Sequence, residues 1–154
     1  MEKNGAPATP DYPIPKWAQP FLIKTSVVLV DGKRYVYAIL RQEAEPAIPG
    51  FVGWPDCTFL FISDKVPVRF RRHFLAHEVR ERDKLAGQPG RCLAALQLEL
   101  AGIPAEIREA YLPYRLAFFG ALLLYYRQKP PDDPTLVAEL TASYEHLKKL
   151  VMGR

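Results

Sequence analysis

Two apolar runs separated only by Asp31-Gly32 constrain the fold of this chain most strongly. The runs are FLIKTSVVLV and KRYVYAIL, residues 21–30 and 33–40, and both are rich in β-branched and aromatic residues. An Asp-Gly pair supplies the positive φ angles that a two-residue hairpin turn requires. The sequence therefore predicts a β-hairpin. Because most positions of both runs are apolar, we expect both faces of this hairpin to be at least partly covered.

The rest of the chain predicts one further strand and then only helices. CTFLFIS, residues 57–63, is a short apolar run bounded by turn residues, which is typical of a strand. A chain of strands followed by helices indicates an α+β fold, here a small antiparallel sheet of about three strands followed by four or five helices. We expect helices over residues 65–86, between Gly90 and Gly102, from Pro104 onward with a kink or break at Pro113, and from Pro134 onward.

The 154 residues suggest one compact domain with an N-terminal arm. Residues 1–20 contain five prolines, and proline lacks a backbone donor and disfavours helix, so this segment predicts an extended arm. Tyr12 and Trp17 are the side chains that could fix the arm to the body. Residues 21–154 then form a single α+β domain.

Charge, cysteine content and hydropathy weigh against several classes of protein, and a nucleic-acid-binding helix through Arg69–Arg72 stays open as the weakest alternative. The net charge is +4, and acidic residues follow the basic cluster Arg69–Arg72, so the sequence does not favour a nucleic-acid partner. Cys57 and Cys92 form no CxxC pattern, which indicates a reducing compartment and predicts a cytoplasmic protein. The longest apolar run, Leu116–Tyr126, is well short of the roughly 20 residues that span a bilayer, so we expect no transmembrane segment.

Chemistry-bearing residues gather in the segment FRRHFLAHEVRERDK, residues 70–84. With 3.6 residues per turn, Phe70, Phe74, His77 and Glu81 share one face of a helix. His77 and Glu81 therefore interrupt an apolar face. Ionisable groups in such a place are paired, hydrogen-bonded or bound to metal, because an isolated buried charge is costly.

The spacing of these residues suits a metal ion. Side chains at positions i and i+4 can reach one ion, and His and Glu are ordinary zinc ligands, so His77 and Glu81 are candidate ligands. His73, one turn earlier, is a candidate additional ligand. Glu99 is the candidate third ligand, because it lies among leucines where a lone carboxylate is costly. The short connection GQPG predicts antiparallel helices, which would bring Glu99 back towards His77.

A His-Glu helix after strands, followed by a helix with a Glu, resembles the zincin-like metallopeptidases, especially their minimal form with a Glu ligand. The resemblance covers roughly residues 21–102 and depends on HEVRE (residues 77–81) and on Glu99. It implies His77 and Glu99 as ligands of zinc or another divalent metal, and Glu78 as the general base acting on metal-bound water that attacks a peptide or protein substrate. Glu81 stands where the family has a second His, and a set of one His and two carboxylates shifts the preference away from zinc.

Two alternatives need no catalysis. His77 can be a core histidine bonded to Glu81, with no metal and no cofactor. The chain can also be a non-catalytic binding or regulatory module of zincin-like fold. The helix that contains Tyr114–Tyr126 is apolar almost all round, which predicts a homodimer through this helix.

Overall fold

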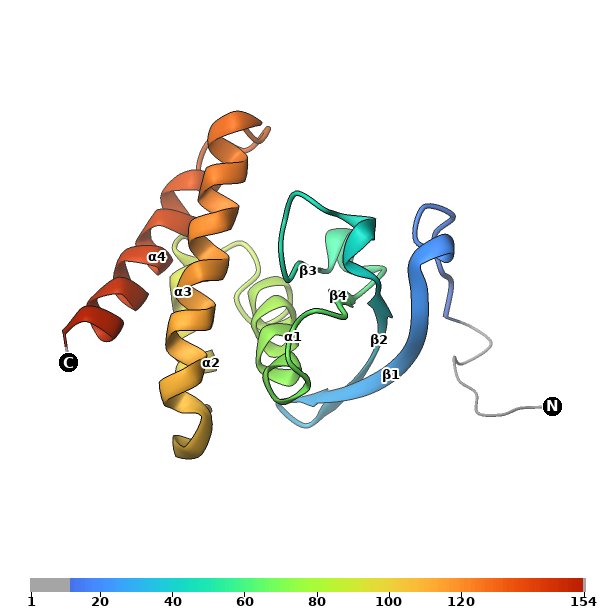
Figure 1. The fold of residues 1–154 in the computed structure, drawn as a ribbon, viewed down its shortest axis with the longest axis horizontal. Helices are drawn as coiled ribbons and strands as arrows, with labels where there is room; N and C mark the ends of the chain where they lie inside the picture. The colour runs from blue at the N-terminus through green and yellow to red at the C-terminus, as the bar shows by residue number, and fades with distance from the viewer. Residues whose placement is uncertain (1–11, 154) are drawn as a thin grey trace.

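The computed structural model describes residues 12–153, which form an α+β fold with a four-stranded sheet followed by four α-helices (Figure 1). This confirms the predicted fold class. The first part of the predicted arm, residues 1–11, lies outside the described residues. In chain order the elements are η1 (Gln19–Phe21), β1 (Leu22–Val30), β2 (Lys33–Leu40), η2 (Gln42–Ala44), β3 (Val52–Gly53), η3 (Pro55–Cys57), β4 (Phe61–Ser63), α1 (Val68–Arg82), α2 (Arg91–Ala101), α3 (Ala105–Gln128) and α4 (Leu136–Met152).

The predicted hairpin is confirmed. Strands β1 and β2 pair antiparallel, from Leu22 opposite Leu40 to Val30 opposite Lys33. Asp31 and Gly32 have φ angles of 50° and 84°. Positive φ at both central residues is the geometry of the turn whose twist matches that of the two strands.

The sheet is mixed, which differs from the antiparallel sheet of about three strands that the sequence predicts. The strand order is β1-β2-β4-β3, and β4 pairs parallel with β2 and antiparallel with β3. A parallel pair needs a long connection, and residues 41–60 provide it. The predicted strand 57–63 begins only at Phe61, because residues 55–57 form a 3-10 turn in which Asp56 and Cys57 both have a φ of 54°.

The described part of the arm packs against the sheet. The Tyr12 hydroxyl donates to the carbonyl of Leu60 at 2.9 Å and accepts from its N–H at 3.1 Å. The Trp17 ring meets the rings of Phe59 and Phe61 edge-on, with centroids 5.9 and 5.4 Å apart. Tyr12 and Trp17 therefore fix residues 12–20 to the body, as the sequence suggested.

Helix α1 lies between the sheet and the other three helices (Figure 1). Its buried face carries Phe70, Phe74 and Leu75, none of which is more than 2% exposed, and it contributes to one continuous core with the sheet and the helices. Helix α2 packs against α1 and α4, and α4 packs against α3. Because α1 is covered on two sides, it presents polar side chains such as His77 to the interior of the molecule.

Helix α3 continues through Pro113, where the sequence predicted a kink or break. A proline inside a helix leaves the carbonyl four residues earlier, here that of Glu109, without its usual donor. Both Pro113 and Glu109 are exposed, so solvent can satisfy this carbonyl.

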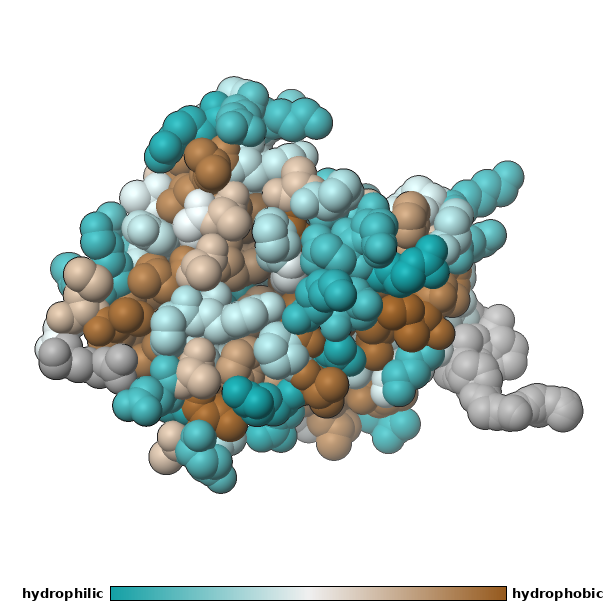
Figure 2. Space-filling model, viewed as in Figure 1, coloured by the Kyte–Doolittle hydropathy of each residue, from teal (hydrophilic) through white to brown (hydrophobic). Residues whose placement is uncertain are grey.

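The segment Tyr114–Tyr126 lies towards the C-terminal end of α3, and its Arg115, Phe118 and Phe119 are buried. Leu124 of the same segment is 52% exposed. Apolar surface over α3 and α4 lies in small groups between polar residues on the face shown in Figure 2. A homodimer through this helix stays a prediction. No helix within residues 12–153 combines the length and the hydropathy needed to cross a membrane.

Candidate metal centre

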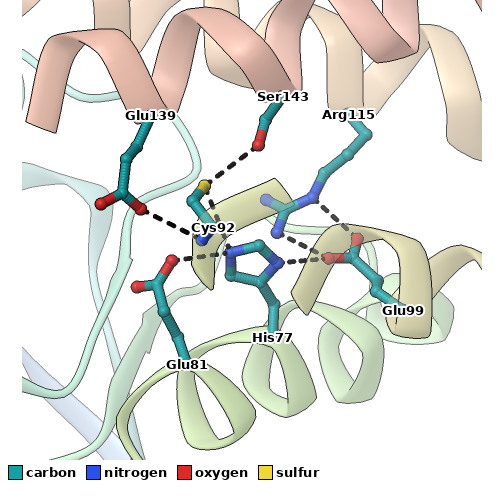
Figure 3. A network of polar contacts seen from close by, with 7 residues as sticks. All are labelled: His77, Glu81, Cys92, Glu99, Arg115, Glu139 and Ser143. Atoms are coloured by element: carbon teal, nitrogen blue, oxygen red, sulfur yellow. Dashed lines mark hydrogen bonds and ion pairs between the residues drawn. The ribbon is translucent and has the colours of Figure 1, made fainter. Parts of the chain in front are cut away.

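His77 is the central residue of the candidate site, and its two ring nitrogens have different partners. The ring is only 2% exposed. Nδ1 lies 2.9 Å from Oε1 of Glu99. Nε2 lies 3.4 Å from a carboxylate oxygen of Glu81 and 3.8 Å from the sulfur of Cys92 (Figure 3). Glu99 therefore lies on one side of the ring, and Glu81 and Cys92 lie on the other.

Glu99 is held by three buried groups. Arg115 donates to it twice, from Nε to Oε2 at 2.8 Å and from Nη2 to Oε1 at 3.0 Å. The Tyr111 hydroxyl also donates to Oε2. Burial alone would raise the pKa of Glu99, but the charge of Arg115 and the bond to His77 lower it to about 2. Glu99 is therefore a carboxylate at neutral pH, although it is only 1% exposed.

An ionised Glu99 sets the orientation of the His77 ring. A carboxylate only accepts hydrogen bonds, so Nδ1 must carry the proton. Nε2 then faces Glu81 and Cys92. Burial lowers the pKa of His77, but its bonds to Cys92, Glu81 and Glu99 outweigh this effect and raise the pKa well above 6.5. The surroundings of this ring therefore favour a positive charge.

His77, Glu81 and Cys92 form a group that can hold a metal ion. One nitrogen, one oxygen and one sulfur from these side chains lie within 4.8 Å of one another. These are the three kinds of donor atom that zinc binds in proteins. We refer to these three residues as the donor group. Glu81 and His77 are one helical turn apart on α1, and Cys92 comes from the first turn of α2.

Helix α4 positions Cys92. Helix α2 begins after Gly90, which has no side chain to cap the free N–H groups of the first turn. Glu139 of α4 fulfils this role, since its Oε1 accepts the backbone N–H of Cys92 at 3.2 Å. Ser143, one turn further along α4, lies 3.2 Å from the Cys92 sulfur through its hydroxyl. The position of this thiol thus depends on α4 as well as on α2 (Figure 3).

The structure brings together some of the sequence-predicted ligands but not all. His77 and Glu81 belong to the donor group. Glu99 reaches His77 as expected, but it lies at Nδ1 and is bound by Arg115 and Tyr111, so it orients the ring from behind. This position follows from the antiparallel pairing of α1 and α2, which places Glu99 beside the ring while the start of α2 lies near Glu81.

His73 is separate from the donor group. It is buried one turn before His77, with its ring centroid 5.7 Å from that of Tyr111. Its Nε2 has no hydrogen-bond partner among residues 12–153. Burial lowers the pKa of His73, which keeps the ring neutral at pH 7. Two helical turns of about 11 Å separate His73 from Glu81, which is too far for both to bind one ion.

Glu78 and the donor group line the same cavity. This cavity has a volume of about 360 Å³, and the loop that carries Phe51 and Trp54 also lines it. The sequence left open whether these two aromatic residues line a cleft or cap the core. Phe51 is 3% exposed and packs in the smaller core cluster, yet both residues also border the cavity. Burial and the nearby charge of Glu81 raise the pKa of Glu78 to about 7.

Sequence reasoning missed five residues of this network. Cys92 is seven positions before Glu99, which places both on the same face of α2, and this spacing could have identified it. Tyr111 and Arg115 are four positions apart in an otherwise apolar helix, and Glu139 and Ser143 are four apart in α4. Polar pairs with this spacing on buried helix faces were the available signal.

Comparisons of this chain with models of protein families, with curated proteins and with solved structures found no match.

Proposed function

We propose that this chain binds one divalent metal ion, preferably zinc, at His77 Nε2, Glu81 and Cys92, and that it is a zincin-like hydrolase of amide bonds. The observation that carries this proposal is the position of the three donor atoms. They lie within 4.8 Å of one another, and all three side chains line the cavity that Glu78 also lines.

The residues present fit a zinc ion of the catalytic kind. Three protein ligands leave one coordination position open, as catalytic zinc sites require. The thiol of Cys92 adds a soft donor to the imidazole and the carboxylate, which restores the preference for zinc. Glu99 supplies the outer partner that ligating histidines usually have, because it accepts the Nδ1 proton.

The roles of the side chains follow from their positions. A bound zinc ion would act as a Lewis acid towards the substrate carbonyl and would activate water. Glu78 directly follows His77 and borders the cavity, so it is the group that would accept the proton of the attacking water and pass it to the leaving amine. The apolar residues Phe51, Phe118 and Phe119 would exclude bulk water from the same cavity.

Metal analysis tests the proposal directly. Purified wild-type protein is expected to contain about one zinc ion per chain, measured by mass spectrometry of the metal after dialysis. His77→Ala and Cys92→Ser should lose the ion. Cys57→Ser is the matched control, because Cys57 is an exposed free cysteine and should not affect binding.

Cobalt provides a second measurement that reports the ligand itself. Replacing zinc by Co²⁺ should give the near-ultraviolet absorption of a cobalt thiolate in the wild type and in the Cys57→Ser variant, but not in Cys92→Ser. Absence of bound metal, or an unchanged spectrum in Cys92→Ser, would refute the proposed ligand set.

Hydrolysis is tested separately from binding. Glu78→Gln keeps the donor group intact, so it should retain the metal while it loses cleavage of a fluorogenic peptide library. Equal cleavage by wild type and Glu78→Gln would contradict the role of Glu78. A chain that binds metal but cleaves nothing would favour the non-catalytic binding module.

A further inference from the structure

The cavity beside the donor group is lined by basic, acidic and apolar residues, and its acidic residues are Glu45, Glu78, Glu81, Asp133 and Glu139. Arg82, Arg91 and Arg115 border it. Among residues 12–153, neither Arg82 nor Arg91 forms an ion pair with an acidic side chain, because the pairs found in this part of the chain involve other residues. Within the described residues, Arg82 and Arg91 therefore have charge and hydrogen-bonding capacity that no acidic side chain takes up in an ion pair.

One guanidinium nitrogen of Arg115 has no hydrogen-bond partner among the described residues. Its Nε and Nη2 bind Glu99, while Nη1 is buried and has no partner within residues 12–153. The guanidinium carbon lies 3.9 Å from the ring centroid of Phe74 and 4.8 Å from that of Phe119, so aromatic faces fix the plane of the group. Nη1 points away from Glu99 (Figure 3). Because Nη1 is buried, a ligand oxygen would reach this unpaired donor only after the side chains around it move.

Arg82 adds a second unused donor. It is the last residue of α1, and its Nε is buried without a partner among the described residues. Arg82 follows Glu78 by four positions, so both side chains project from the same face of α1 and both reach the cavity. A ligand held at Arg82 would therefore lie next to Glu78.

We propose that Arg115 Nη1 and Arg82 Nε bind the carboxylate of a ligand whose apolar part packs against the aromatic wall of this cavity. Arginine N–H groups match the geometry of carboxylate oxygens. The apolar wall is formed by Phe51, Trp54, Phe118, Phe119, Leu122 and Tyr126.

A ligand with a single negative charge fits this cavity better than a dianion. Glu78, Glu81 and Glu139 border the same space and would repel a phosphate more strongly than a carboxylate. The substrate class is then a short peptide or N-acyl amino acid with a free carboxylate and a large apolar side chain. As a substrate assignment this inference rests on the proposed function, whereas the binding of the carboxylate can be measured without metal.

Isothermal titration of metal-free protein, prepared with a chelator, tests this binding. The probes are N-acetyl-L-phenylalanine, its neutral C-terminal amide, and phenyl phosphate. Wild-type protein should bind the carboxylate about tenfold more tightly than the amide, since charge-assisted bonds to arginine contribute at least this much. It should also bind the carboxylate more tightly than phenyl phosphate.

Substitution of Arg82 identifies the site, since loss of Arg115 would also remove the partner of Glu99. Arg82→Gln should reduce the advantage of the carboxylate over the amide at least about threefold. Arg80→Gln is the matched control, because Arg80 lies in the same helix and pairs with Asp31 outside this cavity. It should keep the full advantage.

Three results with metal-free protein would overturn the inference: equal affinity for carboxylate and amide, tighter binding of phenyl phosphate, or an unchanged advantage in Arg82→Gln. None of them depends on bound metal, so failure here is distinct from failure of the zinc titration. Carboxylate binding only after zinc is added would assign the anion to the metal and would also refute this role of the arginines.

Discussion

Glu99 Oε1 lies 2.9 Å from His77 Nδ1 in the interior of the protein, although the two residues are 22 positions apart in the chain. The contact joins α1 to α2, and Arg115 of α3 binds the same carboxylate. A single acid therefore neutralises a buried guanidinium and orients an imidazole. Its removal should affect both the stability of the fold and the proposed binding of metal by His77.

The variant Glu99→Gln tests this double role. Glutamine keeps the shape of the side chain but leaves the charge of Arg115 unpaired in the core, so we expect the free energy of unfolding to fall by about 3–5 kcal/mol. Zinc affinity should fall about 10- to 100-fold, because His77 loses its outer partner. Urea denaturation and zinc titration measure the two effects. A loss of stability below about 0.5 kcal/mol would contradict the buried ion pair.

Removing both charges should cost less than the sum of removing each alone. We expect Glu99→Leu and Arg115→Met, each made separately, to leave an uncompensated charge, whereas the double variant leaves none. In a double-mutant cycle followed by urea denaturation, the coupling free energy should be at least about 1 kcal/mol. Additive effects would mean that solvent already screens the pair.

Loss of the Glu139 carboxylate should destabilise the start of α2. Glu139 accepts the Cys92 N–H where Gly90 provides no cap, so Glu139→Ala should cost about 1 kcal/mol of unfolding free energy. Glu145→Ala is the control, since Glu145 is an exposed residue of the same helix. It should change stability by less than about 0.5 kcal/mol. Thermal denaturation at pH 7 compares the two variants, and equal effects would refute the capping role.

Tyr12 predicts a loss of stability at alkaline pH. Burial raises the pKa of Tyr12 to about 12, although the bond to Leu60 acts in the opposite direction. In the unfolded chain a tyrosine ionises at a pH of about 10, so between these values the unfolded state loses its proton first and becomes favoured. The stability contributed by Tyr12 is present below pH 10 and is lost as the pH rises through 12.

The variant Tyr12→Phe isolates the effect of Tyr12 ionisation on stability, because phenylalanine has no hydroxyl that can ionise. Between pH 10 and 12 the wild type should lose roughly 1 kcal/mol more than the variant, a value reduced for solvent screening of this half-buried group. Parallel pH profiles of the two proteins, measured by urea denaturation, would show that Tyr12 ionises freely in the folded state.

Local chemistry made much of this fold predictable. Asp31-Gly32 specified the hairpin because only a few residue pairs tolerate positive φ at both positions. The short connection between α1 and α2 correctly predicted that Glu99 would approach His77. The two-residue strand β3 and the parallel pairing of β4 were not predictable, because a strand of this length has no periodicity and its pairing depends on distant parts of the chain.

The candidate ligand set was harder to predict than the fold. A buried acid such as Glu99 indicates only that it has a partner of opposite charge, and either a metal ion or an arginine such as Arg115 can be that partner. Arg115 follows Tyr111 by four positions, which places both on one face of α3, but this spacing does not indicate that the pair turns towards Glu99 of α2. Cys92 shares a face of α2 with Glu99, but this spacing names no partner, and the relation of Cys92 to His77 exists only after α2 packs on α1.

The meeting of three helices at Glu99 also limits how the core can be assembled. Because α3 is apolar on most of its surface, hydrocarbon contacts alone would tolerate several rotations and slides of this helix against α1. Any such shift would separate Arg115 and Tyr111 from Glu99. It would leave the charges of Arg115 and Glu99 unpaired in the apolar core. We therefore expect these buried charges to specify how α1, α2 and α3 align, because every misaligned packing would be less stable than the native one.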